Sequence, residues 1–180
     1  MRYIALLRGV NVGGHQVKME RLRALFAELG FLHVRTYIQT GNVFFETAEA
    51  DDREALATAI EAHLRQALGY AVSTCLRTVP ELERTLALDP FKAWTVTDDM
   101  RLNIVFAARP IPPTLDLPLW SAKRDMQIVS ATEMDAFVVW YLINGRAPTD
   151  GKFFERALGS PVTSRFLHTT IKLLQAAKGE

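Results

Sequence analysis

YIALLRGVNVGGHQVKMERLRALFAELG, residues 3–30, decides how the fold begins. The first five residues form an apolar run that is typical of a buried strand. The apolar residues of the second half recur at helical spacing: Met19, Leu22, Leu25, Phe26 and Leu29. They predict a helix that stops at Gly30, because glycine commonly ends helices. With the loop RGVNVGGH, residues 8–15, between them, the two segments predict the first strand-helix step of an α+β domain.

The following segments predict that this step belongs to a ferredoxin-like unit. HVRTYIQTGNVFFET, residues 33–47, contains two β-prone runs, and Gly41-Asn42 between them predicts a tight hairpin turn. A helical pattern over residues 51–69 and a strand pattern over residues 71–79 come next. The order β-α-β-β-α-β is the ferredoxin-like arrangement, which we expect over residues 1–79.

The second predicted helix has signals at both ends. Asp51 stands three residues before Glu54, which resembles a capping box, and Gly69 is a suitable residue to end the helix. Its apolar stripe is Leu56, Ile60, Leu64 and Leu68. The stripe predicts a helix with one buried face.

Residues 80–180 are expected to form a second, smaller α+β half with ferredoxin-like character, packed on the first. Thr78 is a candidate cap for a short helix, and the proline-rich segment RPIPPTLDLP cannot lie inside a sheet. Three further β-prone runs are RLNIVFAA, MQIVS and AFVVWYL, of which the last two predict a hairpin. GKFFERALG and TSRFLHTTIKLLQAA predict two closing helices.

Composition limits the function classes. The net charge of +1 over 180 residues lacks the strong basic excess that is usual for nucleic-acid-binding domains. No apolar run approaches the roughly 20 residues of a membrane span, and the strand pattern begins too early for a signal peptide, so we expect a cytoplasmic protein. The single cysteine, Cys75, excludes an internal disulfide and a cysteine-rich zinc site, and we expect it to be buried and inert. The four histidines show no metal-ligand spacing, and neither a metal nor a cofactor is expected.

The glycine loop is the main candidate site. It matches no named nucleotide-binding fingerprint, but glycines allow close backbone approach and the first amides of a helix attract anions. Because the first two strands of a β-α-β step run parallel, the loop and the turn around residue 40 should emerge at the same end of the sheet. The candidate ligand-binding residues are therefore Arg8, Asn11, Gly13, Gly14, His15, Lys18, Tyr37, Gln39, Thr40, Gly41 and Asn42.

Three stretches carry a resemblance to a known family. MRYIALLRGVNVGG, LGFLHVRTYIQTGNVFF and, more weakly, FFERALGSPVTSRFLHTTIKLL resemble the bacterial family known as domain of unknown function 1697, nearly end to end. The resemblance implies a compact protein with ferredoxin-like halves and no established activity, substrate or catalytic residue. Related proteins typically read Thr-x-Arg-Asn near the C-terminus, where this chain has Thr163, Ser164, Arg165 and Phe166. Arg165 joins the candidate ligand-binding residues.

Three classes of function remain open. The first is a site for a small phosphate- or carboxylate-bearing ligand at the glycine loop, and whether such a protein is an enzyme is undecided, because no nucleophile or acid-base pair is recognisable. The second is a single-stranded nucleic-acid-binding module that uses the sheet face, with Phe44 or Phe45 as a stacking platform. The third is a structural or partner-binding protein whose glycines serve folding alone. Ligand binding ranks first, and the oligomeric state is left open.

Overall fold

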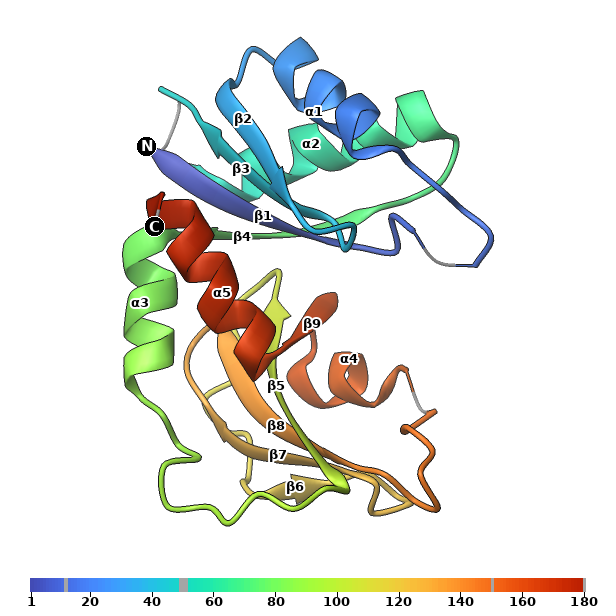
Figure 1. Ribbon diagram of the computed structural model, residues 1–180, viewed down its shortest axis with the longest axis vertical. Helices are drawn as coiled ribbons and strands as arrows, with labels where there is room; N and C mark the ends of the chain where they lie inside the picture. Colours follow the sequence, from blue (N-terminus) through green and yellow to red (C-terminus); the bar gives the residue numbers. More distant parts are fainter. Residues whose placement is uncertain (12, 49–51, 150, 180) are drawn as a thin grey trace. The chain divides into compact units, whose positions relative to one another are not determined.

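The computed structural model describes residues 1–11, 13–48, 52–149 and 151–179 (Figure 1). The chain divides into two compact units. The first comprises Met1–Glu83 and the end of the C-terminal helix from Leu173, and the second comprises Arg84–Lys172. No helix in the described ranges is long and apolar enough to cross a membrane.

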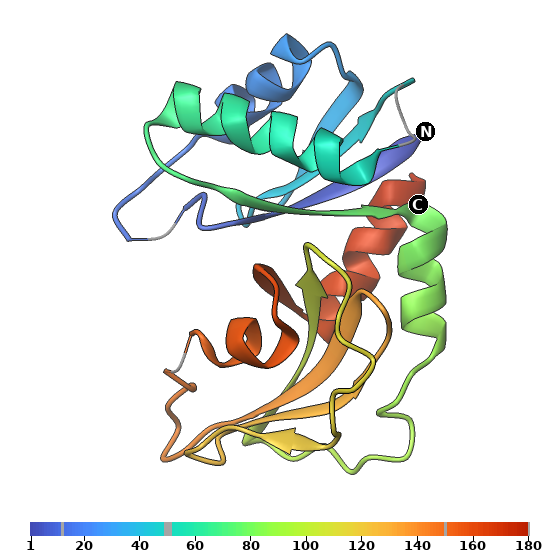
Figure 2. The ribbon, with the colours of Figure 1, turned by 180° about the vertical axis from the view of Figure 1, so that it is seen from behind.

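The first unit has the predicted ferredoxin-like order. Its elements are β1 (Arg2–Arg8), α1 (Met19–Glu28), β2 (Leu32–Tyr37), β3 (Asn42–Glu46), α2 (Arg53–Leu68) and β4 (Ser73–Thr78). The strands lie in the order β2-β3-β1-β4, and all neighbouring pairs are antiparallel. Figure 2 shows α1 and α2 side by side on one face of this sheet. The predicted fold class is confirmed.

Strand β1 explains why its sequence is a continuous apolar run. Tyr3, Ala5 and Leu7 belong to the core that β1 shares with α1 and α2. Ile4 and Leu6 alternate with them on the opposite face and are also fully buried. A central strand that is buried on both faces needs apolar residues at every position.

Two details of the first unit differ from expectation. The N-cap of α2 is Asp52, whose carboxylate accepts a hydrogen bond from the Ala55 amide at 2.9 Å, whereas Asp51 lies outside the described residues. The predicted tight turn at Gly41-Asn42 is wrong, because Asn42 is already the first residue of β3 and pairs with Tyr37. The turn therefore spans residues 38–41. Gly69 ends α2 in a left-handed conformation, as expected.

The second sheet repeats the strand order of the first. Its strands are β5 (Met100–Ala107), β6 (Leu119–Trp120), β7 (Met126–Ala131), β8 (Asp135–Tyr141) and β9 (Val162–Phe166). They lie in the order β6-β7-β8-β5-β9. Without the two-residue edge strand β6, this order corresponds to β2-β3-β1-β4, and α4 (Phe153–Leu158) takes the place of α2. The proline-rich segment follows β5 in the chain, at the position that α1 has after β1 in the first unit. The ferredoxin-like character of the second half is thus confirmed.

Two further helices complete the chain, and one boundary needs correction. They are α3 (Val79–Ala87) and α5 (Leu167–Lys178). The last helix was expected to begin at Thr163, but residues 163–166 form most of β9, which pairs with β5. Pairing along the free edge of β5 satisfies backbone groups that a longer helix would leave unpaired, so tertiary structure decides this boundary.

Candidate functional site

The β1–α1 loop and the β2–β3 turn lie together at one end of the first sheet (Figure 1). The Leu7 amide donates a hydrogen bond to the Gly41 carbonyl at 2.8 Å. The side-chain amide of Asn11 donates to the Gln39 carbonyl at 3.1 Å. The common location follows from the parallel directions of β1 and β2.

Two asparagines of the candidate set hold this end of the sheet together. Asn11 links both segments, because its side-chain oxygen also accepts from the Val17 amide at 2.6 Å. Asn42 is fully buried, and its amide donates to the Tyr37 carbonyl at 3.1 Å and to the Thr40 hydroxyl at 2.7 Å. These side chains are engaged with the protein itself.

A separate part of the candidate set faces solvent. Its members are Gly13, Gly14, His15, Lys18, Gln39 and Thr40. Gly13 and Gly14 have φ of +64° and +88°, and a Cβ on either would meet no described atom within 4 Å. Glycine is therefore present at these two positions for reasons of backbone conformation, and the main chain at both glycines is accessible.

His15 stacks on an aromatic residue that the sequence did not connect to it. The rings of His15 and Tyr70 lie 3.8 Å apart with an angle of 17° between their planes. The Tyr70 hydroxyl donates to the Val10 carbonyl at 2.9 Å, and burial raises the pKa of this phenol. Tyr70 directly follows the glycine that ends α2, but no spacing rule relates it to residue 15. The contact fixes the otherwise exposed imidazole beside the loop.

The amino end of α1 opens into the same loop. Lys18 is its N-cap residue, with an extended backbone (φ −64°, ψ 138°) and no capping hydrogen bond from its side chain. A lysine side chain has no hydrogen-bond acceptor. The N-cap side chain of α1 therefore accepts no hydrogen bond from the first-turn amides of this helix. Lys18 adds positive charge at this end of the helix, and Glu20 in the first turn offsets part of it.

The remaining candidates fall on other surfaces. Arg8 alternates with Ile4 and Leu6 and so projects from the face opposite α1 and α2. Leu6 pairs with Asn42, which places Arg8 and Asn42 on one face as diagonal neighbours. Tyr37 lies opposite Asn42 on β2. Arg165 lies on β9 in the second unit, where its guanidinium donates to the Thr163 hydroxyl and the Ser164 carbonyl, both at 2.8 Å.

Among the described residues, the metal-ligating groups, the cysteine and the two adjacent phenylalanines form no further site. Within the described ranges, no group of three or more His, Cys, Asp or Glu side chains is arranged to hold a metal ion. Cys75 is buried in β4, as predicted. Phe44 and Phe45 are 3% and 0% exposed, so neither ring is presented on a sheet face.

Comparison with known proteins agrees with this fold. No curated protein matches the sequence. The chain is similar in structure to the conserved bacterial protein SP0830 from Streptococcus pneumoniae, with a TM-score of 0.63 and 21% sequence identity over 98% of each chain. At this identity the likeness shows the fold. Residues 1–136 match the family model described as Protein of unknown function (DUF1697). Because the match covers residues 1–136, well over half of the 180 residues, the chain belongs to the DUF1697 family.

Proposed function

We propose that the exposed part of the β1–α1 loop, with the adjoining β2–β3 turn, binds a small anion bearing a phosphate or carboxylate group. The observation that carries the proposal is the open amino end of α1 with the exposed side chains of His15 and Lys18 beside it. Backbone N–H groups at a helix start and a positive dipole end favour negative charge.

The residues of the loop have separate roles in this proposal. Lys18 supplies charge, and His15 donates a hydrogen bond from a ring held in place by Tyr70. The exposed glycines let the anion approach the main chain. Asn11 ties the loop to the turn, Asn42 closes the turn, and neither contacts the ligand.

The test is a set of thermal melts with and without phosphate, sulfate, succinate and a panel of nucleotides. At tenfold excess over Kd, a bound anion adds about 1.4 kcal/mol of stability, which raises Tm by about 3–5 °C for a chain of this size. We expect this gain in the wild type and its loss in His15→Ala and Lys18→Ala. Sulfate and phosphate also stabilise proteins without binding, by exclusion from the surface. Lys92→Ala, which removes an exposed lysine from the second unit, measures that general effect.

The outcomes separate binding from architecture. If no anion stabilises the wild type more than Lys18→Ala, the loop has only a structural role, which the ties through Asn11 and Asn42 already support. The nucleic-acid function is tested by titrating labelled single strands at low salt, where phosphate contacts give a steep salt dependence. Burial of Phe44 and Phe45 disfavours that function, because stacking requires an exposed ring.

A further inference from the structure

A pocket lies in the first unit at the opposite end of β1 from the glycine loop. Its volume is about 500 Å³, and its lining residues are Met1, Arg2, Thr78, Val79, Pro80 and Lys178. They come from the start of β1, the β4–α3 junction and the last turn of α5. Small-molecule sites commonly measure roughly 300–1,000 Å³, so the pocket has the size of a ligand site.

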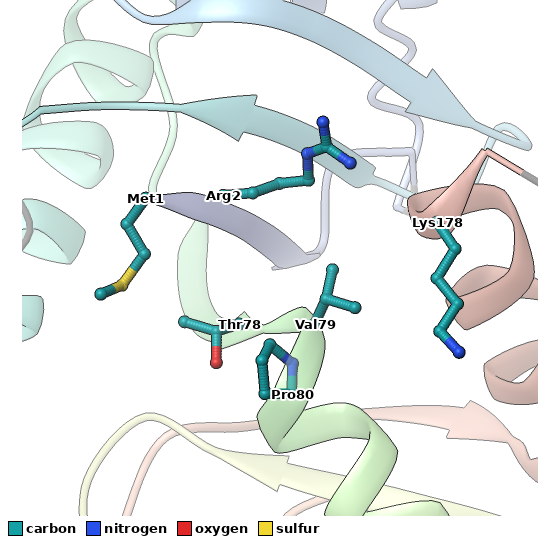
Figure 3. Close-up of a pocket in the computed structure, with 6 residues that line it drawn as sticks. All are labelled: Met1, Arg2, Thr78, Val79, Pro80 and Lys178. Carbon is teal, nitrogen blue, oxygen red and sulfur yellow. The ribbon is translucent and has the colours of Figure 1, made fainter.

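The inner surface of this pocket is mainly apolar. Figure 3 shows Val79 and Pro80, in the first turn of α3, between Met1 on one side and Lys178 on the other. Met1 is 62% exposed, and a ligand with an apolar body would remove its side chain from water. The transfer of apolar surface out of water is favourable, so this burial would stabilise the bound ligand.

Two cationic side chains border the apolar surface. The guanidinium of Arg2 donates to the Glu46 carboxylate through Nε and Nη2, at 3.0 and 2.8 Å, and to the Ala177 carbonyl through Nη1 at 3.3 Å. Three of its five N–H groups are thus engaged, and two have no partner among the described residues. Arg2 can therefore accept a further anionic oxygen without losing its present contacts.

Lys178 is the second cation. Its ammonium lies 2.6 Å from the Glu83 carboxylate, and both side chains are more than a third exposed. A surface ion pair of this kind contributes little to stability, so a ligand carboxylate can replace Glu83 at small cost.

The amino end of α3 does not compete for the ligand. The Thr78 amide donates to the Glu81 carboxylate at 2.8 Å, and the Glu81 amide donates back to the Thr78 hydroxyl at 3.4 Å. This capping box satisfies the helix start. Among the side chains that line the pocket, recognition of negative charge is left to Arg2 and Lys178.

We infer that this pocket binds a small amphipathic carboxylate, whose apolar body contacts Met1, Val79 and Pro80 and whose carboxylate binds Lys178 at the border of the pocket. The argument is charge complementarity: an apolar hollow with two cations at its border fits a molecule with one anionic end. The inference is independent of the anion site at the glycine loop.

The test uses untagged protein labelled with [methyl-13C]methionine and titrated with octanoate. The Met1 methyl lines the pocket, whereas Met126 is buried in the core of the second unit and serves as an internal control. We expect octanoate to shift the Met1 resonance and to leave Met126 unchanged. 1-Octanol, which has the same apolar body and no charge, should bind more weakly.

Three variants test the geometry. Lys178→Gln should weaken octanoate binding by up to about fivefold, as expected for a partly exposed ion pair. Lys172→Gln, which changes an exposed lysine of the same helix outside the pocket, should leave octanoate binding unchanged. Val79→Trp should fill the apolar part of the pocket and block octanoate binding. If this variant does not fold, the comparison of Lys178→Gln with Lys172→Gln and of octanoate with octanol still tests the inference. An unchanged Met1 resonance at millimolar octanoate, equal binding of octanol, or equal affinities of the two lysine variants would overturn the inference.

Discussion

At Gly41 the β2–β3 turn passes so close to β1 that a side chain would crowd Leu7. A Cβ at this position would lie 3.1 Å from the Leu7 Cβ and 3.3 Å from the Leu7 carbonyl oxygen, and the residue has φ of +74°. The same approach allows the Leu7 amide to donate to the Gly41 carbonyl. Both the backbone conformation and the contact therefore favour glycine.

We predict that Gly41→Ala destabilises the protein by about 2–4 kcal/mol, from left-handed strain and overpacking together. Gly13→Ala is the matched control, because Gly13 has φ of +64° but open space around it, so that only the strain of about 1–2 kcal/mol remains. Chemical denaturation of the two variants measures the difference. Equal losses would show that the close approach to Leu7 contributes nothing.

At this scale the sequence predicted which segments are neighbours but not which contacts their side chains make. Placing the glycine loop and the turn together followed from strand direction alone. That Asn42 faces inward and closes the turn could not be predicted, because the position depends on a four-residue turn rather than the two-residue turn that Gly41-Asn42 suggests. Tyr70 was missed because its contact with His15 is made by folding and follows no local pattern.

Among the elements, helix α3 is stabilised at its amino end by Glu81, a charged residue. Glu81 completes the capping box with Thr78 and accepts a hydrogen bond from Arg53. Burial by itself would raise the pKa of Glu81, but the hydrogen bonds from Thr78 and the nearby Arg53 guanidinium outweigh it, so the pKa is lowered. The carboxylate form is therefore preferred by the folded protein.

We predict that Glu81→Gln lowers the stability at pH 7 by about 1 kcal/mol and that this difference disappears in acid. A pKa lower in the folded than in the unfolded chain stabilises the fold above the unfolded value, about 4.3, and this contribution is lost as the pH falls through the folded pKa. Denaturation at pH 7 and at intervals down to pH 3 measures it.

The control for this pH series is Glu54→Gln, which alters an exposed carboxylate in the first turn of α2. Glu46, whose pKa is lowered by its hydrogen bond with Arg2, is present in every variant and cancels in the comparison. A stability difference for Glu81→Gln that stays constant from pH 7 to pH 3 would contradict the assignment.

The spacing of apolar residues predicted most helices and strands. It failed where strand pairing, and not the local sequence pattern, determines the secondary structure. The stripes of α1 and α2 and the apolar runs of β1 and β5 are long enough to be recognised. The two residues of β6 are too few to form a pattern. The residues of β9 continue directly into α5, and only the free edge of β5 makes them a strand.

Over the whole molecule, the two sheets correspond in strand order and in the register of their central strands. Ile4 on β1 lies opposite Phe44 and Arg77, and Ile104 on β5 lies opposite Phe137 and Arg165. The two arginines also make the same local contact, because each donates through Nη1 to the carbonyl of the residue before it, at 2.6 Å in β4 and 2.8 Å in β9. The correspondence is not visible as a close sequence repeat, because the two sheets share strand order and register.

The correspondence leads to a prediction for Arg165, which the family motif placed among the ligand-binding residues. Arg77 is 1% exposed, and Arg77→Ala should cost about 2–4 kcal/mol through lost packing and an unsatisfied carbonyl. Arg165 is half-buried, so Arg165→Ala should cost less, about 1–2 kcal/mol, and should keep the full stabilisation by phosphate or sulfate. Denaturation measures the first effect and thermal melts with the anions measure the second. An Arg165→Ala protein that is as stable as the wild type but no longer responds to the anion would assign Arg165 to the ligand, and the likeness to Arg77 would then be one of backbone register alone.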